Sequence, residues 1–393
     1  MRKAPSRTVV LADLHLMRRS PEKLTRDVVS FIDAQRGQRI AFAGDLLDLS
    51  AESDRVARED GIREVLGAHP TIRRALGEHL DHGGELRFVA GNHDAEIAAE
   101  DFRTTFLESL GTRLADPEQV KATPWFFHEG GLHLEHGHLY DPDNAPAHPL
   151  SASPSLGVHF VEDFIAKTGA HAYLNANDGM PLKMFLSSFA MYGPRAPYVI
   201  YRFFHASFGA LGQSGPFFRA EQRHRDGEAR ESAFAAAARM ESELVRALLE
   251  GRPAPTLASM KQTFLRLYLD RVAASLGILG GAACLLSGKR NTGTLVLSLG
   301  LLGMFASWAR GRNRYGGGVV RHLQEGASRV AEITGAKFVI FGHTHKELTG
   351  ERYANTGSFS FPGASPGRPY VTVHHREGEA ASLSRGYWKW SAT

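Results

Sequence analysis

Short apolar runs alternate with longer amphipathic stretches in the first third of the chain. The runs at 8–11, 39–43, 86–90 and 132–135 predict β-strands, because each is four or five residues long and rich in large apolar side chains. Between them, apolar positions at helical spacing predict helices near 21–36, 55–82 and 95–110. This alternation is typical of βαβ units with parallel strands.

The last eighty residues have a different order of elements. A helical pattern at 319–334 is followed by a predicted strand at 337–341. The runs at 347–353, 370–375 and 380–388 predict antiparallel strands at the end of the domain. Parallel strands followed by antiparallel ones predict an α/β fold with a mixed sheet, arranged as an αββα sandwich.

The two halves of this predicted domain are separated by a large insertion. It starts in a loop rich in Pro and Asp, passes through a block dense in Phe and Tyr, and continues at 221–250 as a charged, Ala-rich stretch typical of solvated helices. We therefore predict a first domain part at 1–139, a mainly helical insertion at 140–315 and a second domain part at 316–393.

The insertion ends in two uncharged apolar runs, at 272–288 and 291–309, which predict a hydrophobic helical hairpin over 272–309. The first run would be about 25 Å long as a helix, the short limit for crossing a bilayer. Ala273, Gly277 and Gly281 repeat every four residues, the spacing that lets membrane helices approach closely.

Basic residues flank the hairpin at both outer ends, and Trp308 suits an interfacial anchor, so we expect contact with a membrane. The charged turn at Lys289 and Arg290 is the feature that fits least well. A hairpin buried in the insertion, or an oligomer interface, is the alternative.

Composition narrows the class of protein only slightly. The 393 residues are 43% hydrophobic and 22% charged, and the net charge of +4 does not by itself argue for a nucleic-acid partner. A single cysteine, Cys284, rules out an intramolecular disulfide, and the first apolar run is too short for a signal peptide. We expect a cytoplasmic catalytic domain, attached by the hairpin to the inner face of the cytoplasmic membrane.

Five polar clusters lie at the ends of predicted strands. They are Asp13 with His15, Asp45 with Asp48, Asn92 with His93 and Asp94, His136 with His138, and His343 with His345. One Asp-x-His pair is weak support for a site, but the whole set supplies the carboxylate, amide and imidazole donors that two divalent cations about 3.5–4 Å apart require.

In order and spacing these clusters resemble the calcineurin-like metallophosphoesterase superfamily, with its Asp-x-His, Gly-Asp-x-x-Asp, Gly-Asn-His-Asp and Gly-His-x-His blocks. The match covers 1–140 and 316–393, and the Asn-Thr-Gly-Ser sequence at 355–358 also looks like the family's turn. The resemblance implies a phosphoester hydrolase that holds two divalent metals, manganese being expected and iron or zinc being alternatives, with a hydroxide that bridges them.

Roles follow from the resemblance residue by residue. Asp13, His15 and His345 would bind the first metal, Asn92, His136 and His343 the second, and Asp45 would bridge both.

His93 would lie beside the scissile phosphate as a hydrogen-bond donor or acid, with Asp94 orienting its ring. Asp48 is either a cap or a support for the ligands. His138 supports His136, contacts substrate, or lies on the surface.

The insertion must select the substrate, since the metals recognise only the phosphoryl unit. The chain is similar, more distantly, to bacterial UDP-2,3-diacylglucosamine hydrolases, which carry a helical lid for acyl chains, but it has histidines at 93 and 138 where those enzymes have arginine and an acid. We expect a lipid-linked or nucleotide phosphoester or pyrophosphate as substrate.

Two alternatives remain. A soluble phosphodiesterase or nuclease would hold a polyanion with the arginines at 219, 223, 225 and 310–314. A catalytically inactive, membrane-anchored binding protein is the other.

Overall fold

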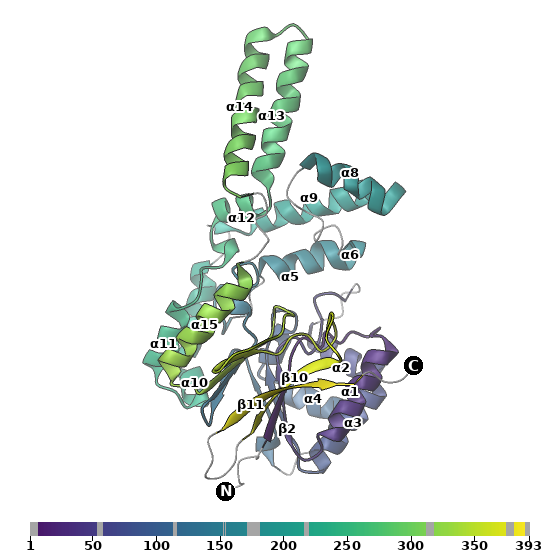
Figure 1. Ribbon diagram of the computed structural model, residues 1–393, viewed down its shortest axis with the longest axis vertical. Coiled ribbons are helices and arrows are strands. Elements are labelled where there is room, and N and C mark those ends of the chain that lie inside the picture. Colours follow the sequence, from purple (N-terminus) through teal and green to yellow (C-terminus); the bar gives the residue numbers. More distant parts are fainter. Residues whose placement is uncertain are drawn as a thin grey trace. The chain divides into compact units, whose positions relative to one another are not determined.

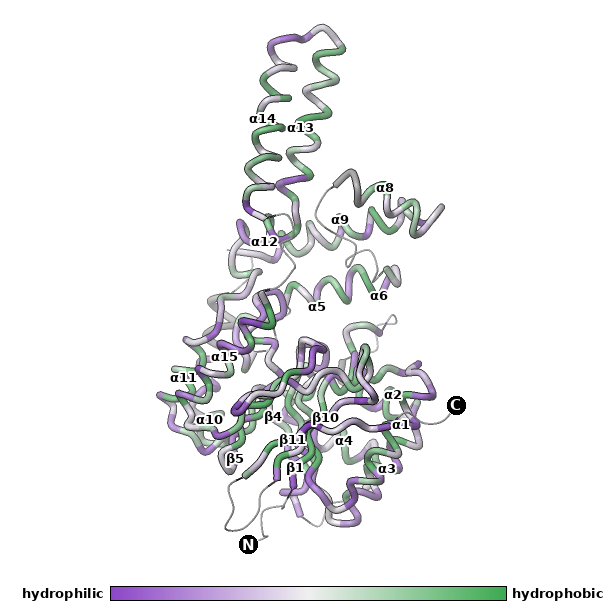
Figure 2. The backbone as a smooth tube through the Cα atoms, viewed as in Figure 1, coloured by the Kyte–Doolittle hydropathy of each residue, from purple (hydrophilic) through white to green (hydrophobic). Residues whose placement is uncertain are grey.

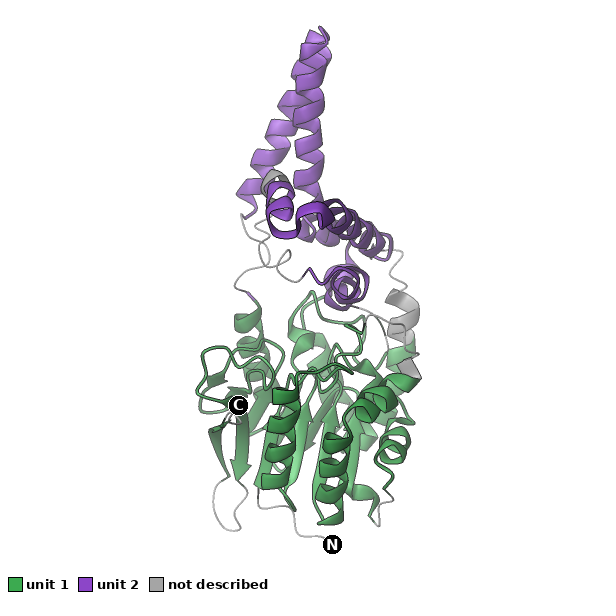
Figure 3. Ribbon diagram, turned by 90° about the vertical axis from the view of Figure 1, so that its right-hand side faces the viewer, with its two compact units in different colours: residues 1–154, 222–254, 319–393 green, residues 155–221, 255–318 purple. Residues whose placement is uncertain are grey.

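The computed structural model describes residues 7–52, 58–112, 116–151, 153, 155–170, 181–215, 220–311, 318–374 and 381–389, without the side chains of 58–59, 181–184 and 220–225. The chain is mixed α/β and forms two compact units (Figure 3). The first unit comprises 1–154, 222–254 and 319–393, and the second comprises 155–221 and 255–318.

Two mixed sheets form the centre of the first unit. The six-stranded sheet has the order β11-β10-β1-β2-β3-β4, in which β1 to β4 are parallel, while β10 is antiparallel to β1 and β11. Its strands are β1 Arg7–Leu11, β2 Arg39–Ala43, β3 Glu85–Val89, β4 Val120–Thr123, β10 Arg368–His374 and β11 Ser382–Trp388.

The five-stranded sheet has the order β5-β6-β7-β9-β8, with β6, β7 and β9 parallel. Its strands are β5 Phe126–Glu129, β6 Leu132–Glu135, β7 Phe338–Phe341, β8 Leu348–Thr349 and β9 Tyr353–Asn355.

Helices cover the outer face of each sheet (Figure 1). Those beside the six-stranded sheet are α1 Glu22–Ala34, α2 Arg58–Ala68, α3 Pro70–Asp81 and α4 Phe102–Leu110, and those beside the other are α10 Ala220–Ala238, α11 Ser242–Glu250 and α15 Val319–Thr334. Short helical turns occur at η1 Ala95–Ala98, η2 Pro117–Gln119 and η3 His138–Tyr140.

Alternate side chains of the strands build three hydrophobic layers. In β1, Val9 and Leu11 pack in the core toward α1–α4, whereas Val10 packs in the core between the sheets. In β7, Ile340 joins the core between the sheets and Val339 joins the core toward α11 and α15. Because strand residues alternate between faces, both sheets are covered on both sides, and the order of layers is helix, sheet, sheet, helix.

The predicted strands are confirmed in position, with small differences. The run at 347–353 forms two short strands, β8 and β9, and β4 and β5 were not predicted because each has only four residues and little apolar alternation. The helix expected at 55–82 divides at Pro70, whose missing N–H suits the first turn of α3. Residues 55–57, 375 and 380 lie outside the described ranges.

The second unit is helical. Its elements are α5 Leu156–Phe160, η4 Val161–Ile165, α6 Ala166–Thr168, α8 Pro181–Tyr192, η5 Gly193–Arg195, α9 Ala196–Gly212, η7 Thr256–Ala258, α12 Met260–Arg266, α13 Leu269–Leu286 and α14 Arg290–Ala309. The antiparallel pair α13 and α14 is the predicted hairpin, and Figure 2 shows that many of its residues are hydrophobic and that those at its ends are hydrophilic. Both helices are long and apolar enough, by length and composition, to cross a membrane.

The predicted insertion at 140–315 is not one unit. Residues 140–154 and 222–254, the latter with most of α10 and all of α11, belong to the first unit. Phe234, Val245 and Leu248 from this part join the core that includes residues of β7 and α15.

Candidate metal centre

The predicted ligands follow five strands of the two sheets. Asp13 and His15 follow β1, Asp45 follows β2, and Asn92 follows β3, three parallel neighbours in one sheet. The remaining predicted ligands follow β6 and β7, parallel neighbours in the other sheet: His136, His343 and His345. The carboxyl ends of parallel strands meet at one edge of each sheet. The edges of the two sheets also come together, since Nε2 of His15 and Nε2 of His345, 330 positions apart and from different sheets, are 3.1 Å from each other.

The backbone at these residues is strained. Among described residues other than glycine, seven have a positive φ, and five of them are predicted ligands: Asp13, His15, Asp45, His343 and His345. A left-handed backbone costs a residue with a Cβ about 1–2 kcal/mol, and such strain gathers at functional sites. The fold therefore maintains an unfavourable conformation at the side chains that the sequence singles out.

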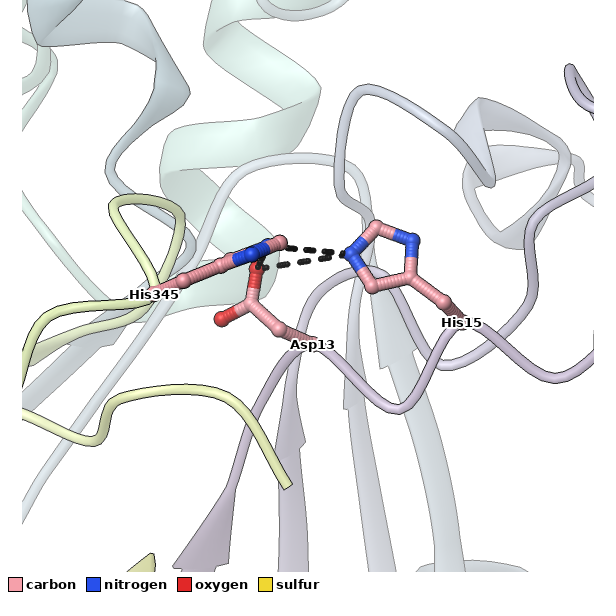
Figure 4. A group of neighbouring side chains, drawn as sticks. All are labelled: Asp13, His15 and His345. Carbon is pink, nitrogen blue, oxygen red and sulfur yellow. Dashed lines mark hydrogen bonds and ion pairs between the residues drawn. The ribbon is translucent and has the colours of Figure 1, made fainter. Parts of the chain in front are cut away.

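The first ligand set converges (Figure 4). Nε2 of His345 lies 3.1 Å from Nε2 of His15 and 3.2 Å from Oδ1 of Asp13. Oδ1 of Asp13 lies 3.9 Å from Nε2 of His15. Donors that share a cation at about 2.1 Å stand about 3.0–3.4 Å from one another, so two of these three separations match and one is slightly longer.

The second set gathers around His136. Its Nε2 lies 3.1 Å from Oδ2 of Asp45 and 3.2 Å from Oδ1 of Asn92, while its Nδ1 faces the carbonyl of Ala43 at 2.8 Å. A donor nitrogen turned to a carbonyl leaves the other nitrogen free to bind a metal. Oδ2 of Asp45 is also 3.9 Å from Nε2 of His15, so this one oxygen lies between the two sets.

Glycines in the sequence motifs make room for these ligands. A Cβ on Gly44 would lie 2.4 Å from the ring of His136, and a Cβ on Gly91 would lie 2.0 Å from Oδ1 of Asp45. A larger side chain at either position would displace a ligand, which explains why a glycine precedes Asp45 and another precedes Asn92.

His93 is held by residues from the loop after β2. Its Nδ1 lies 2.9 Å from Oδ1 of Asp48 and 2.7 Å from Oγ of Ser50, and its backbone N–H donates to Oδ1 of Asp45. Asp48 also lies 3.3 Å from Nδ1 of His15 and accepts the N–H of Ala51. Asp48 thus both caps its turn and orients two site histidines.

The prediction that Asp94 orients the ring of His93 is wrong. The carboxylate of Asp94 accepts backbone N–H groups from Gly91, Asp45 and Leu47 at 2.7–3.2 Å. Asp94 instead fixes the loops that carry Asp45 and Asn92. The motif placed His93 and Asp94 side by side, but adjacent side chains on an irregular loop need not point the same way.

Sequence reasoning missed Asp141 and Asn144. Oδ2 of Asp141 lies 3.0 Å from Nε2 of His343 and accepts from Nδ2 of Asn144 at 2.8 Å. Oδ1 of Asn144 accepts from Nδ2 of Asn92 at 3.4 Å. This chain of contacts joins two of the predicted second-metal ligands. The available signal was their place in the polar loop just after the His136 block.

His343 and His138 complete the surroundings of the second set. The ring of His343 lies 5.3 Å from that of His136, and its backbone N–H donates to Oδ2 of Asp13. His138 is buried, with its ring 5.3 Å from His136, so it is not a surface histidine. Phe361, which sequence reasoning also missed, stacks on His345 and is 59% exposed.

The charges of the site reinforce one another. Burial alone would raise the pKa of Asp45, but the attraction of His136 and His93 outweighs it and holds the pKa well below its usual value. Burial would lower the pKa of His136, but Asp45 raises it to about 10. Burial, with the charge of Asp45, raises the pKa of Asp94 to about 7.

The donor set fits a divalent metal. Three groups of described side chains lie close enough together to hold an ion: Asp13 with His15 and His345, Asp13 with Asp45 and His136, and His15 with Asp45 and His93. Oδ1 of Asp13 is buried, and its contact with His345 is an ionic one. Carboxylate and imidazole donors buried together are typical of metal sites.

No protein-family model and no curated protein sequence matches this chain.

Proposed function

We propose that this protein is a metal-dependent phosphoester hydrolase that uses two divalent cations and has the fold of the calcineurin-like metallophosphoesterases. The position of Asp45 carries the proposal, since its Oδ2 lies between His136 of one ligand set and His15 of the other. Two cations bound there would activate a water molecule and offset the negative charge that develops on a phosphoryl group.

Each predicted site residue would have a separate role in binding the cations or the substrate. Asp13, His15 and His345 would hold one cation, and Asn92, His136 and His343 the other. His93 would donate a hydrogen bond to the phosphoryl group or a proton to the leaving oxygen. Asp48 and Ser50 would hold its Nδ1, so that Nε2 is the atom offered to substrate.

The same site with an exposed apolar hairpin favours a membrane-associated enzyme and a lipid-linked or nucleotide phosphoester or pyrophosphate as substrate. Leu279 and Phe305 of the hairpin are each 67% exposed, which does not fit the alternative of a hairpin buried in its own unit. The nuclease alternative relied on Arg219, which lies outside the described residues, and on Arg223 and Arg225, whose side chains do as well.

A panel assay tests the reaction. Purified protein loaded with manganese, iron or zinc is incubated with bis-p-nitrophenyl phosphate, a nucleotide diphosphate lipid and single-stranded DNA. We expect metal-dependent hydrolysis of the first two. Absence of hydrolysis with every metal, while two ions are bound per chain, would contradict the proposal.

A deletion tests the attachment. Removing 272–309 should move the protein from the membrane fraction to the soluble fraction. An unchanged membrane fraction would show that the hairpin is not the anchor.

A further inference from the structure

The two helices of the hairpin contact each other through small residues. A Cβ on Gly277 would lie 3.3 Å from Cα of Gly300, and one on Gly281 would lie 2.4 Å from the backbone N of Leu297. The large side chains point outward instead; besides Leu279 and Phe305, those more than half exposed are Leu276, Leu286, Leu295, Leu299, Leu301, Leu302 and Trp308. Small residues inside and leucine outside is the arrangement of helices surrounded by lipid.

The length of the hairpin is closer to that of a whole bilayer than to that of one leaflet. The uncharged parts of α13 and α14, at 272–286 and 291–309, rise about 22 Å and 28 Å, against a hydrocarbon thickness of about 30 Å. Lys289 and Arg290 are exposed at the turn. A hairpin that stopped at the midplane would leave both cations in hydrocarbon, where a charged side chain is unfavourable. A full crossing delivers them to the far headgroups.

A second apolar face belongs to α8 and α9. Helix α9 buries Val199 and Phe203, the latter against Phe160 and Phe164. Its opposite side exposes aromatic rings, with Tyr201 60% and Phe208 61% exposed. Helix α8, which contacts α9, exposes further large apolar side chains: Phe185, Leu186, Phe189 and Met191. Tyr is enriched where a bilayer meets water, and helices lying in that plane bury a face that carries Phe and Leu.

The position and the charge of this face fit a location in the headgroup layer at the base of the hairpin. Helix α8 contacts α13, and α9 contacts α12, which precedes α13 at the base of the hairpin. Figure 1 shows α8 and α9 at the base, running across the direction of the hairpin. Between 185 and 212 the sequence has two arginines and no acidic residue. Of these, Arg202 turns inward to the carbonyl of Asp163. The face therefore presents nothing that anionic headgroups would repel.

We propose that the hairpin crosses the full bilayer and that α8 and α9 lie in the near headgroup layer as a second contact. The partner is the lipid surface itself. This inference rests on the membrane attachment proposed above and specifies its topology.

The experiment uses the full chain in vesicles of phosphatidylethanolamine and phosphatidylglycerol, oriented so that added protease reaches the first unit. One reporter is Ser287→Cys in a Cys284→Ser background, treated with a membrane-impermeant maleimide. The other is Phe208→Trp in a Trp308→Phe background, with lipids brominated near the headgroups. Because Trp125, Trp388 and Trp390 remain, the emission of the background protein is measured separately and subtracted. The matched control is Tyr387→Trp in the same background, because Tyr387 is an exposed aromatic residue on β11 of the first unit.

We expect the cysteine to react only after detergent opens the vesicles, and brominated lipid to quench Trp at 208 but not at 387. Immediate labelling in intact vesicles would overturn the crossing. Equal fluorescence at 208 with and without bromine would overturn the interfacial role of α9. A protein that does not float with vesicles would overturn the attachment itself, a result distinct from both.

Discussion

Replacing Asp141 with Asn tests the second metal set without touching a predicted ligand. Oδ2 of Asp141 takes two contacts, from Nε2 of His343 at 3.0 Å and from Nδ2 of Asn144 at 2.8 Å. Oδ1 accepts the N–H of Asp143 at 3.1 Å. If the single oxygen of an amide keeps that backbone hydrogen bond, its NH₂ group faces His343 and cannot accept from it.

The expected loss of metal affinity follows from the role of a residue that hydrogen-bonds to a metal ligand. His343 would lose the acceptor that fixes which of its nitrogens carries the proton, so Nδ1 would no longer be held as the metal-binding atom. Loss of a partner of this kind costs about 10- to 100-fold in metal affinity, which is about 1.4–2.7 kcal/mol. We expect the affinity for the second cation to fall by that factor, while the affinity of the set of Asp13, His15 and His345 for its cation stays unchanged.

Equilibrium dialysis against manganese, followed by mass-spectrometric metal analysis, gives both affinities. Asp143→Asn is the matched control, because Asp143 is on the same loop and contacts Asp141 through its backbone. The reasoning is refuted if Asp141→Asn binds two ions with affinities within about threefold of the parent, well below the effect expected of such a partner. A thermal melt of both variants separates a metal effect from unfolding.

The other predictions concern the centre of the site. Asp45→Asn should abolish nearly all hydrolysis, because both cations lose a shared anionic ligand. Turnover and metal content are measured on the same sample, and full turnover with both ions retained would refute the bridging role of Asp45. His93→Ala should slow hydrolysis by about 10²–10⁴ with metal content near that of the parent, and loss of metal would make His93 a ligand instead. The metal-free protein should melt at lower temperature as pH rises from about 6.5 to about 10. The folded-state pKa is raised to about 10 for His136 and about 9 for His93, so their stabilisation is complete below the unfolded value of 6.5 and is lost as the pH rises through the folded-state values. A melting temperature that does not fall over this range in the chelated protein would contradict the charge pairing.

Local pattern was enough to place most elements and the predicted ligands. The strand runs at 8–11 and 39–43 and the helix at 319–334 needed only the period of apolar residues, since each is buried on one or both faces. The residues predicted to be ligands could be named because each follows such a strand in a short motif. The structure then brings Asp13 and His345 to 3.2 Å of each other across the chain.

The sequence did not predict the directions in which these side chains point. Asp94 was expected at His93 but accepts backbone N–H groups, while Asp48, an undecided residue, holds His93. These choices depend on φ and ψ at a few irregular positions, and a motif records only residue types. The same applies to Asp141, which reaches His343 over 202 positions of sequence.

The sequence by itself determined the layered α/β class, the strand-end clusters and the apolar hairpin, because hydrophobic period and donor type are properties of short segments. The tertiary structure alone decided which oxygen lies between the two ligand sets, which residues hold His93 and His343, and which part of the predicted insertion completes the first unit. These features arise from contacts between distant segments, whose geometry is fixed only when the sheets and helices pack.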